Sequence, residues 1–169
     1  MKGRTFRFAL FICYTMKFVA DVMLGKLARW LRVAGIDVLY NNTIADEELI
    51  IITQEQNRVL LTRDRKLAVD KKVKEAIMID NQLIDAQLKE FFMKTHLVPD
   101  NFFTRCLLCN EILQELPDKS IIQDRVPPFI YKTHDEFSIC IKCDKIYWKG
   151  THRDNMIKKF DTIIGEKNA

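Results

Sequence analysis

The sequence lacks the features that define several protein classes. Glycine and proline are scarce, at five and four of 169 residues, and no repeat or low-complexity segment is present. With 48% hydrophobic and 30% charged residues, the composition is typical of a globular chain and excludes a disordered one. No apolar run approaches the roughly 18 to 20 residues that a membrane-spanning helix needs. We therefore expect no membrane partner.

A strong excess of charge of either sign is also missing. The net charge is +4 and the isoelectric point is near 8.8, which permits a nucleic-acid partner without requiring one. The net charge therefore does not indicate a function, and the sequence motifs are more informative.

Residues 1–15 fit a globular domain least well. Lys2, Arg4 and Arg7 precede the apolar residues 8–14, which resembles a secretory leader, but no small-residue cleavage site follows. We favour the interpretation that translation starts at Met16 and that residues 1–15 are an N-terminal extension.

Short apolar segments alternate with amphipathic ones in residues 16–96. The patterns predict strands at 18–21, 37–40, 58–62 and 77–79, and helices at 23–34, 46–56, 65–76 and 83–93. Gly35 stands where a left-handed residue would end the first helix. Such alternation predicts an α/β fold with a parallel, doubly wound sheet of four or five strands.

Acidic residues follow the predicted strands. Asp21 ends the first apolar run, Asp46 and Glu47 open the second helix, and Asp64 follows the strand at 58–62. Carboxyl ends of parallel strands meet at one sheet edge, so we expect these carboxylates to converge there. Convergent carboxylates repel one another unless a cation lies between them, and Mg²⁺ or Mn²⁺ prefers such oxygen ligands. This predicts a metal site suited to phosphodiester hydrolysis.

A purely structural interpretation stays open for these acids. Asp46 can be a helix N-cap, Glu47 can lie in a solvated first turn, and Asp64 can simply begin the next helix. Asp21 is harder to explain in this way, because a carboxylate that closes an apolar strand needs a partner to offset its desolvation.

The five cysteines do not have the spacing of a disulfide framework. Four of them form two Cys-x-x-Cys pairs, Cys106 with Cys109 and Cys140 with Cys143, and Cys13 is left over. This spacing predicts a tetrahedral Zn²⁺ with four thiolate ligands, which is a closed and therefore structural site. A redox or iron–sulfur role is the alternative. A thiolate site favours a reducing compartment, so we expect the cytoplasm.

The composition changes near residue 97. Short apolar pieces separated by Pro117 and by Pro127-Pro128 predict small β-hairpins that depend on the metal. We expect four parts: the extension at 1–15, the α/β domain at 16–96, a zinc ribbon at 97–160 and a tail at 161–169.

Two groups of side chains are candidates for binding RNA. The predicted first helix carries Lys26, Arg29 and Arg32 on one face, and Arg63 and Arg65 flank Asp64, so these cations could track a phosphate backbone. After the second cysteine pair, Trp148, Lys149 and His152 mix aromatic and cationic groups, as single-strand binding surfaces do. The alternatives are a solvated basic face, a Trp148 packed under the zinc site and a His152 that caps a helix.

At this point the sequence resembles the PIN-like ribonuclease domains, and among them the Mut-seven C-terminal RNase family, which joins such a domain to a zinc ribbon. The matching pieces are FVAD at 18–21, LGKLARWLR at 24–32, ADEEL at 45–49, LLTRDR at 60–65, the paired cysteines and YWKGTH at 147–152. They extend over residues 17–156.

The resemblance implies a three-layer, metal-dependent ribonuclease with Asp21, Asp46 and Asp64 on the family's acidic positions. In the wider PIN group a further acid lies between the first strand and the position of Asp46. Here that interval holds only Asp37, at the start of a strand and so at the opposite edge, and Glu47 would substitute.

The resulting hypothesis is a ribonuclease that uses Mg²⁺ or Mn²⁺, with a zinc ribbon that helps to bind single-stranded RNA. A non-catalytic RNA-binding or adaptor protein is the main alternative, and a zinc-ribbon factor that acts on protein partners is a third. The RNA, the choice between internal and terminal cleavage, and self-association stay open.

Overall fold

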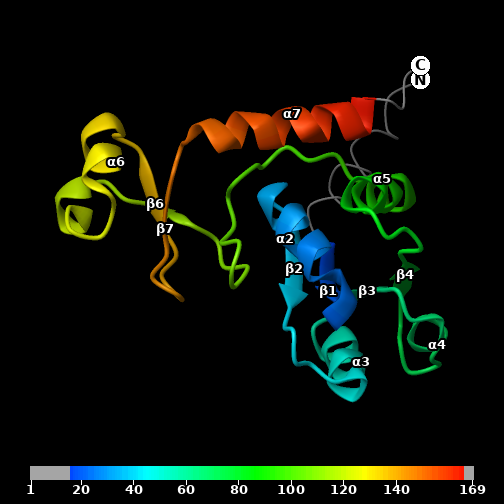
Figure 1. Cartoon of the computed structure of the whole chain (residues 1–169). Coiled ribbons are helices and arrows are strands. Elements are labelled where there is room, and N and C mark those ends of the chain that lie inside the picture. Colours follow the sequence, from blue (N-terminus) through cyan, green and yellow to red (C-terminus); the bar gives the residue numbers. More distant parts are fainter. Residues whose placement is uncertain (1–15, 166–169) are drawn as a thin grey trace, which may run out of the picture.

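A computed structural model describes residues 16–165 (Figure 1). The expectations for the extension at 1–15 and for residues 166–169 of the tail lie outside the described residues. Within residues 16–165 the first part of the chain forms a four-stranded sheet in the order β2-β1-β3-β4, and all neighbouring strands are parallel. The parallel sheet predicted from the alternation of segments is confirmed. Its strands are β1 (Lys17–Ala20), β2 (Asp37–Tyr40), β3 (Val59–Thr62) and β4 (Ala76–Met78).

Helices cover both faces of this sheet. They are the 3₁₀ helix η1 (Val22–Leu24) and the α-helices α2 (Gly25–Val33), α3 (Asp46–Glu55), α4 (Arg65–Ala68) and α5 (Ile84–Thr95). Successive strand residues point to opposite faces. Phe18 of β1 therefore packs with α2 and α5, whereas Val19 packs with α3 and α4. The central strands β1 and β3 are buried on both faces and read as continuous apolar runs, whereas the edge strands β2 and β4 are partly buried. Helices on both faces of the sheet give the three-layer arrangement.

Two of the predicted helices are wrong in extent. The helix expected from residue 23 begins as η1 and becomes α-helical only at Gly25. The helix expected at 65–76 ends at Ala68, because the Asp70 carboxylate accepts a hydrogen bond from the Lys72 amide at 2.7 Å and turns the chain. The helix expected at 83–93 is α5, and Leu83 precedes it as its N-cap and is 77% exposed.

Gly35 ends α2 in the left-handed conformation that the sequence predicts. Its φ is 81°, and a Cβ at this position would overlap the backbone carbonyl of Asn101. The close approach of these two backbones places Asn101, which follows the predicted boundary at residue 97, against the end of α2. Phe103 continues this contact by donating its amide hydrogen to the Val33 carbonyl at 2.8 Å.

Replacing Gly35 with alanine is therefore expected to destabilise the protein. A left-handed alanine costs about 1–2 kcal/mol, and the overlap with Asn101 adds roughly 1–3 kcal/mol if the backbone has to move. Urea denaturation measures the loss. Gly165→Ala is the matched control, because nothing lies within 4 Å of an added Cβ at that position. Equal stability of the two variants would contradict the tight packing at Gly35.

The second part of the chain is small and mostly irregular. A three-stranded antiparallel sheet in the order β5-β6-β7 is formed by β5 (Gln114–Glu115), β6 (Phe137–Ile139) and β7 (Ile146–Trp148). Between β5 and β6 lie η2 (Lys119–Ile122) and α6 (Pro128–Thr133). Its apolar core is centred on only Ile122, Val126, Phe137 and Ile146. So small a core agrees with the expectation that this part depends on a metal.

The last helix, α7 (Thr151–Gly165), returns from the ribbon to the α/β layers (Figure 1). Its Phe160 is 1% exposed and lies with its ring centroid 5.6 Å from that of Trp30 and 6.0 Å from that of Phe92. Residues 161–165, which we expected in the tail, are thus helical. The division into a domain at 16–96 and a ribbon at 97–160 stays a prediction. No helix within residues 16–165 has both the length and the apolar character that crossing a bilayer requires.

Candidate functional site

Three strand ends define the edge at which we expected the acids. Because β1 lies between β2 and β3 and all three are parallel, the residues that follow them lie along the same carboxyl edge. Asp21 directly follows β1, Asp64 is the second residue after β3, and Asp46 opens α3 after the loop that leaves β2. The sheet topology thus brings these three strand-to-helix connections to one edge, which is where open α/β sheets bind their ligands.

Asp21 is the most constrained of these acids. It is 4% exposed. Its Oδ1 accepts a hydrogen bond from the Met23 amide at 2.8 Å, which caps η1. Its Oδ2 accepts from the Arg63 amide at 2.9 Å and from the Thr62 hydroxyl. These three donors offset the desolvation that burial imposes on the carboxylate.

The same contacts leave room for one more partner. A carboxylate has about four acceptor positions, and Asp21 uses two of them on Oδ2 and one on Oδ1. Oδ1 therefore keeps an acceptor position that a cation can occupy.

Thr62 links Asp21 to Asp64. Its hydroxyl donates to Asp21 Oδ2 and accepts from the Asp64 amide at 2.9 Å. Asp64 in turn caps α4, since its Oδ1 accepts from the amides of Lys66 at 2.7 Å and Leu67 at 3.3 Å. Thr62 is fully buried and was not among the site residues predicted from the sequence. Its position at the end of an apolar strand could have identified it, because a buried hydroxyl needs a hydrogen-bond partner just as Asp21 does.

Asp46 and Glu47 lie in solvent at the start of α3. The N-cap of α3 is Ala45 and not Asp46, so the expectation that Asp46 caps this helix is wrong. The two side chains stand in the first turn, where negative charge favours the helix dipole. Within residues 16–165 the acids form no group of three or more ligand atoms lying within 4.8 Å of one another. They share an edge and are not packed into one pocket.

The four cysteines do form such a group. The Sγ atoms of Cys106, Cys109, Cys140 and Cys143 all lie within 4.8 Å of one another. The Cys106–Cys143 and Cys109–Cys140 sulfur pairs are 3.4 and 3.3 Å apart, far longer than the bond of about 2.05 Å in a disulfide. Four sulfurs around a zinc ion with bonds of about 2.3 Å would be roughly 3.8 Å apart. The cysteines therefore fit the group predicted from their spacing and could hold a zinc ion.

Tyr147 supports this cysteine group. Its hydroxyl contacts Cys106 Sγ at 3.2 Å and accepts from the Leu107 amide at 3.1 Å. Burial raises the pKa of the Cys106 thiol, but hydrogen bonds from Tyr147 and from backbone amides outweigh burial and lower it to about 6. Burial raises the pKa of Cys109 to about 12. The group therefore carries its full negative charge only when a cation compensates it.

The first cysteine pair is fastened to the sheet by a buried arginine. Arg32 is 3% exposed. Its guanidinium donates to the carbonyls of Leu107 at 3.1 Å, Leu108 at 2.9 Å and Val38 at 2.9 Å. The prediction that Arg32 shares an exposed, RNA-binding face with Lys26 and Arg29 is wrong, because Arg32 is buried and its Nε and Nη1 donate to these three carbonyls.

Asn110 adds a second link between the ribbon and β2. Its side chain accepts from the Val38 amide at 3.0 Å and donates to the Asp37 carboxylate at 2.7 Å. Asp37 also pairs with Arg58 at 2.6 Å and Arg105 at 3.6 Å. Burial raises the pKa of Asp37, but these hydrogen bonds and the nearby cations lower it below its ordinary value. Asp37 thus lies at the amino edge of the sheet and serves as a structural ion pair there.

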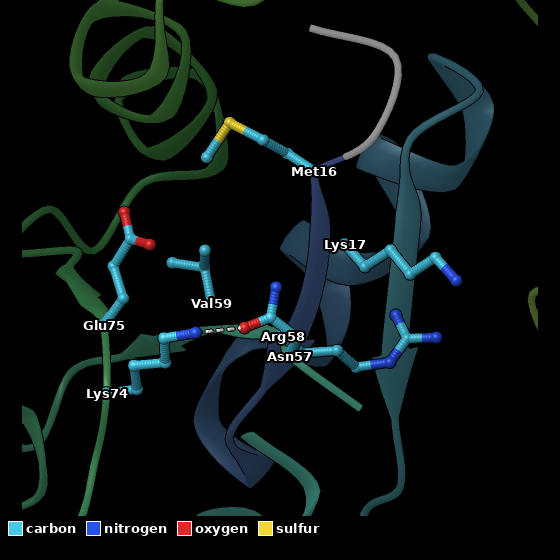
Figure 2. Close-up of a pocket in the computed structure, with 7 residues that line it drawn as sticks. All are labelled: Met16, Lys17, Asn57, Arg58, Val59, Lys74 and Glu75. Carbon is cyan, nitrogen blue, oxygen red and sulfur yellow. Dashed lines mark hydrogen bonds between the residues drawn. The ribbon is translucent and has the colours of Figure 1, made fainter. Parts of the chain in front are cut away.

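The described structure also has a pocket at this amino edge (Figure 2). Its volume is about 180 Å³, and Lys17, Arg58 and Lys74 are among the residues that line it. Lys74 is held by a hydrogen bond to the Asn57 side chain at 2.6 Å. This pocket lies at the opposite edge from Asp21 and Asp64, so it is not the site predicted from the acids.

The remaining candidates for RNA contact are mostly at the surface. Lys26, Arg29 and Arg65 are exposed, and Arg63 is half-buried beside Asp21. In the ribbon, Lys149 and His152 are exposed and Trp148 is 38% exposed. The residue that packs on the cysteines is Tyr147 and not Trp148.

No curated protein and no solved structure matches the chain significantly. One family model, described as the Mut7-C RNAse domain, matches residues 16–160. Because this match covers most of the sequence, the resemblance drawn from the motifs is confirmed, and the chain belongs to the Mut7-C RNAse domain family.

Proposed function

We propose that this protein is a metal-dependent ribonuclease that hydrolyses phosphodiester bonds of single-stranded RNA. Membership of an RNase domain family implies RNA as a substrate or partner. The observation that carries the catalytic proposal is the buried Asp21 carboxylate, which the Thr62 hydroxyl links to the Asp64 junction at the carboxyl edge of the sheet.

Asp21, Asp46 and Asp64 would hold Mg²⁺ or Mn²⁺, with Glu47 as a further ligand or as a base that acts on a water. Mg²⁺ usually keeps several of its own waters and needs only one or two carboxylates directly. The lack of a tight group of three carboxylates among the described residues is therefore compatible with one ion. When bound, such an ion would activate a water and stabilise the charge on the reacting phosphate.

The protein's own groups supply the rest of the chemistry. Asp21 keeps its orientation because three donors hold it, and Thr62 transmits that orientation to the start of α4. Lys26, Arg29 and Arg65 would track the RNA backbone electrostatically. A structural zinc ion would hold the ribbon, which would present Trp148, Lys149 and His152 to the bases and phosphates of the RNA. Four thiolates favour a reducing compartment such as the cytoplasm.

The second candidate is a non-catalytic RNA-binding or adaptor protein. The observation that favours it is that Asp21 and Asp64 both cap helices, so each has a structural task even without a metal. The adaptor predicts salt-dependent RNA binding without cleavage.

The test is cleavage of an end-labelled single-stranded RNA by the full chain with Mn²⁺, with Mg²⁺ or with EDTA. We expect cleavage with either metal and none with EDTA. Because EDTA also competes for zinc, the treated protein is supplied again with zinc alone, which should not restore cleavage, and then with zinc and Mn²⁺, which should. RNA that is bound but uncut under every condition would favour the adaptor.

Asp64→Asn is expected to lower cleavage about tenfold, a change of about 1.4 kcal/mol in the barrier. Asparagine is as good an N-cap as aspartate, so α4 should keep its cap while the site loses one negative charge. Asp70→Asn is the matched control, since Asp70 also orders a local turn through a backbone amide. Equal cleavage by Asp64→Asn and the control would remove Asp64 from the site.

A further inference from the structure

Arg63 differs from the other arginines that the structure buries wholly or in part. In residues 16–165, Arg32, Arg58 and Arg105 donate to carbonyl or carboxylate oxygens, and Arg153 lies 5.0 Å from the centroid of the Phe103 ring. Arg63 is half-buried, and its Nε has no accessible surface and no hydrogen-bond partner. A buried charged donor without an acceptor is costly and uncommon in folded proteins.

Arg63 lies at the carboxyl edge of the sheet, so an acceptor for its Nε would have to bind at that edge. Its own amide donates to Asp21 Oδ2 at 2.9 Å, and it stands between Thr62 and Asp64 in the chain. The arginine is thus rooted at the carboxyl edge, between the two acids that the proposed function places around the metal.

The neighbouring acids do not satisfy the guanidinium. Asp21 receives hydrogen bonds from two amides and a hydroxyl, and the hydrogen bonds of Asp64 come from amides of α4. No ion pair of Arg63 is formed within the described residues, although Asp64 follows it directly in the chain. An acceptor from outside the protein remains as the partner, and the half-buried Arg63 side chain has to turn toward solvent for its Nε to reach that acceptor.

The chemistry of the site selects a phosphate group as that acceptor. A guanidinium is a planar fork that binds two oxygens of a phosphate at once. Phosphoryl transfer develops charge on the non-bridging oxygens, so a fixed donor aimed at them stabilises the transition state.

We propose that Arg63 binds a non-bridging oxygen of the RNA phosphate that is cleaved, and so is a catalytic residue of the acidic site. This inference rests on the proposed ribonuclease function and deepens it. The prediction from the sequence placed Arg63 with Arg65 as general backbone contacts. The unmet Nε donor separates the two, because Arg65 is exposed and can be satisfied by water.

Kinetics of Arg63→Gln and Arg63→Lys test the proposal. Removing one such donor typically lowers the rate about 100-fold, and lysine should not restore it because it lacks the fork. Arg65→Gln should weaken RNA binding only a fewfold. Lys71→Gln is the matched loss of one exposed positive charge, away from the site. Addition of free guanidinium should partly restore cleavage by Arg63→Ala.

Stability separates a catalytic from a structural arginine. Because Nε has no partner in the protein and a buried donor without an acceptor is destabilising, Arg63→Gln should unfold at the same urea concentration as the wild type or at a higher one. A large stability loss together with inactivity that guanidinium does not rescue would assign Arg63 a structural role and overturn the inference.

A measurement that needs no catalysis keeps the two proposals distinguishable. Inorganic phosphate should raise the melting temperature of the wild type more than that of Arg63→Gln, whether or not the RNA is cut. If Asp21→Asn abolishes cleavage while Arg63→Gln cleaves normally, the role of Arg63 is wrong and the ribonuclease stands. If no metal-dependent cleavage occurs, the function fails, and an equal phosphate shift in both proteins also removes the phosphate site.

Discussion

Replacing Asp21 with asparagine is expected to lower RNA cleavage by about 100- to 1,000-fold, the largest effect of any single substitution at the acidic edge. Metal-ion catalysis supplies several kcal/mol of transition-state stabilisation, and each 1.4 kcal/mol corresponds to a factor of about ten. Asp21 is the one buried acid of the proposed site, at 4% exposure, so water screens its charge least. Titration of Mn²⁺ against cleavage rate should show a much higher metal requirement in the variant.

Part of the effect of Asp21→Asn will be on stability. The amide group of asparagine replaces one acceptor oxygen by a donor, so one of the three hydrogen bonds to Asp21 has to be lost at a cost of about 1–3 kcal/mol. Asp118→Asn is the matched control, because Asp118 also caps a short helix, through the Ser120 amide at 2.8 Å. A folded Asp21→Asn protein that cleaves RNA at the wild-type rate would refute the proposed site.

The sheet could be predicted from the sequence because its two central strands, β1 and β3, are buried on both faces. Continuous apolar runs at 18–20 and 59–61, separated by an amphipathic helix and a glycine stop, leave few alternatives to a parallel sheet. The same logic places Asp21 and Asp64 at one edge. Helix lengths were less predictable, because local hydrogen bonds such as that of Asp70 end α4 against the helical pattern.

The side-chain contacts between distant segments could not be predicted. Arg32 has the spacing of a surface cation on an amphipathic helix. It is buried because the segment that contains Leu107 and Leu108 packs over it and accepts its hydrogen bonds. Asn110 and Tyr147 become important in the same way. Periodicity within one helix contains no information about a segment some 75 residues later.

These contacts join the cysteine group to the α/β layers. Arg32, a buried residue of α2, donates hydrogen bonds to two carbonyls within the first Cys-x-x-Cys turn. Asn110 accepts a hydrogen bond from the Val38 amide of the edge strand β2. β2 pairs with β1 over its whole length, and β1 ends at Asp21. The order of the cysteine group and the order of the acidic edge are therefore physically linked.

Loss of zinc is expected to destabilise the whole protein and not only the ribbon. Zinc supplies much of the folding free energy of small thiolate modules, so the ribbon should lose its order in Cys140→Ser. Arg32 would then keep a buried charge without two of its three acceptors, at about 1–3 kcal/mol for each lost partner. A loss of about 3 kcal/mol corresponds to roughly 10 °C in melting temperature for a chain of this size.

Hydrogen exchange can locate that loss. The Val38 amide donates to the Asn110 side chain at 3.0 Å, so its exchange should become faster in Cys140→Ser although Val38 lies in the parallel sheet. Cys13→Ser is the matched control, because Cys13 belongs to neither Cys-x-x-Cys pair and its removal should leave one zinc per chain. Because Val38 reports on the sheet and zinc content on the ribbon, the two measurements together distinguish a local from a global effect. Protection of Val38 that is unchanged after loss of zinc would show that the ribbon and the sheet are independent, and the proposed link through Arg32 and Asn110 would be wrong.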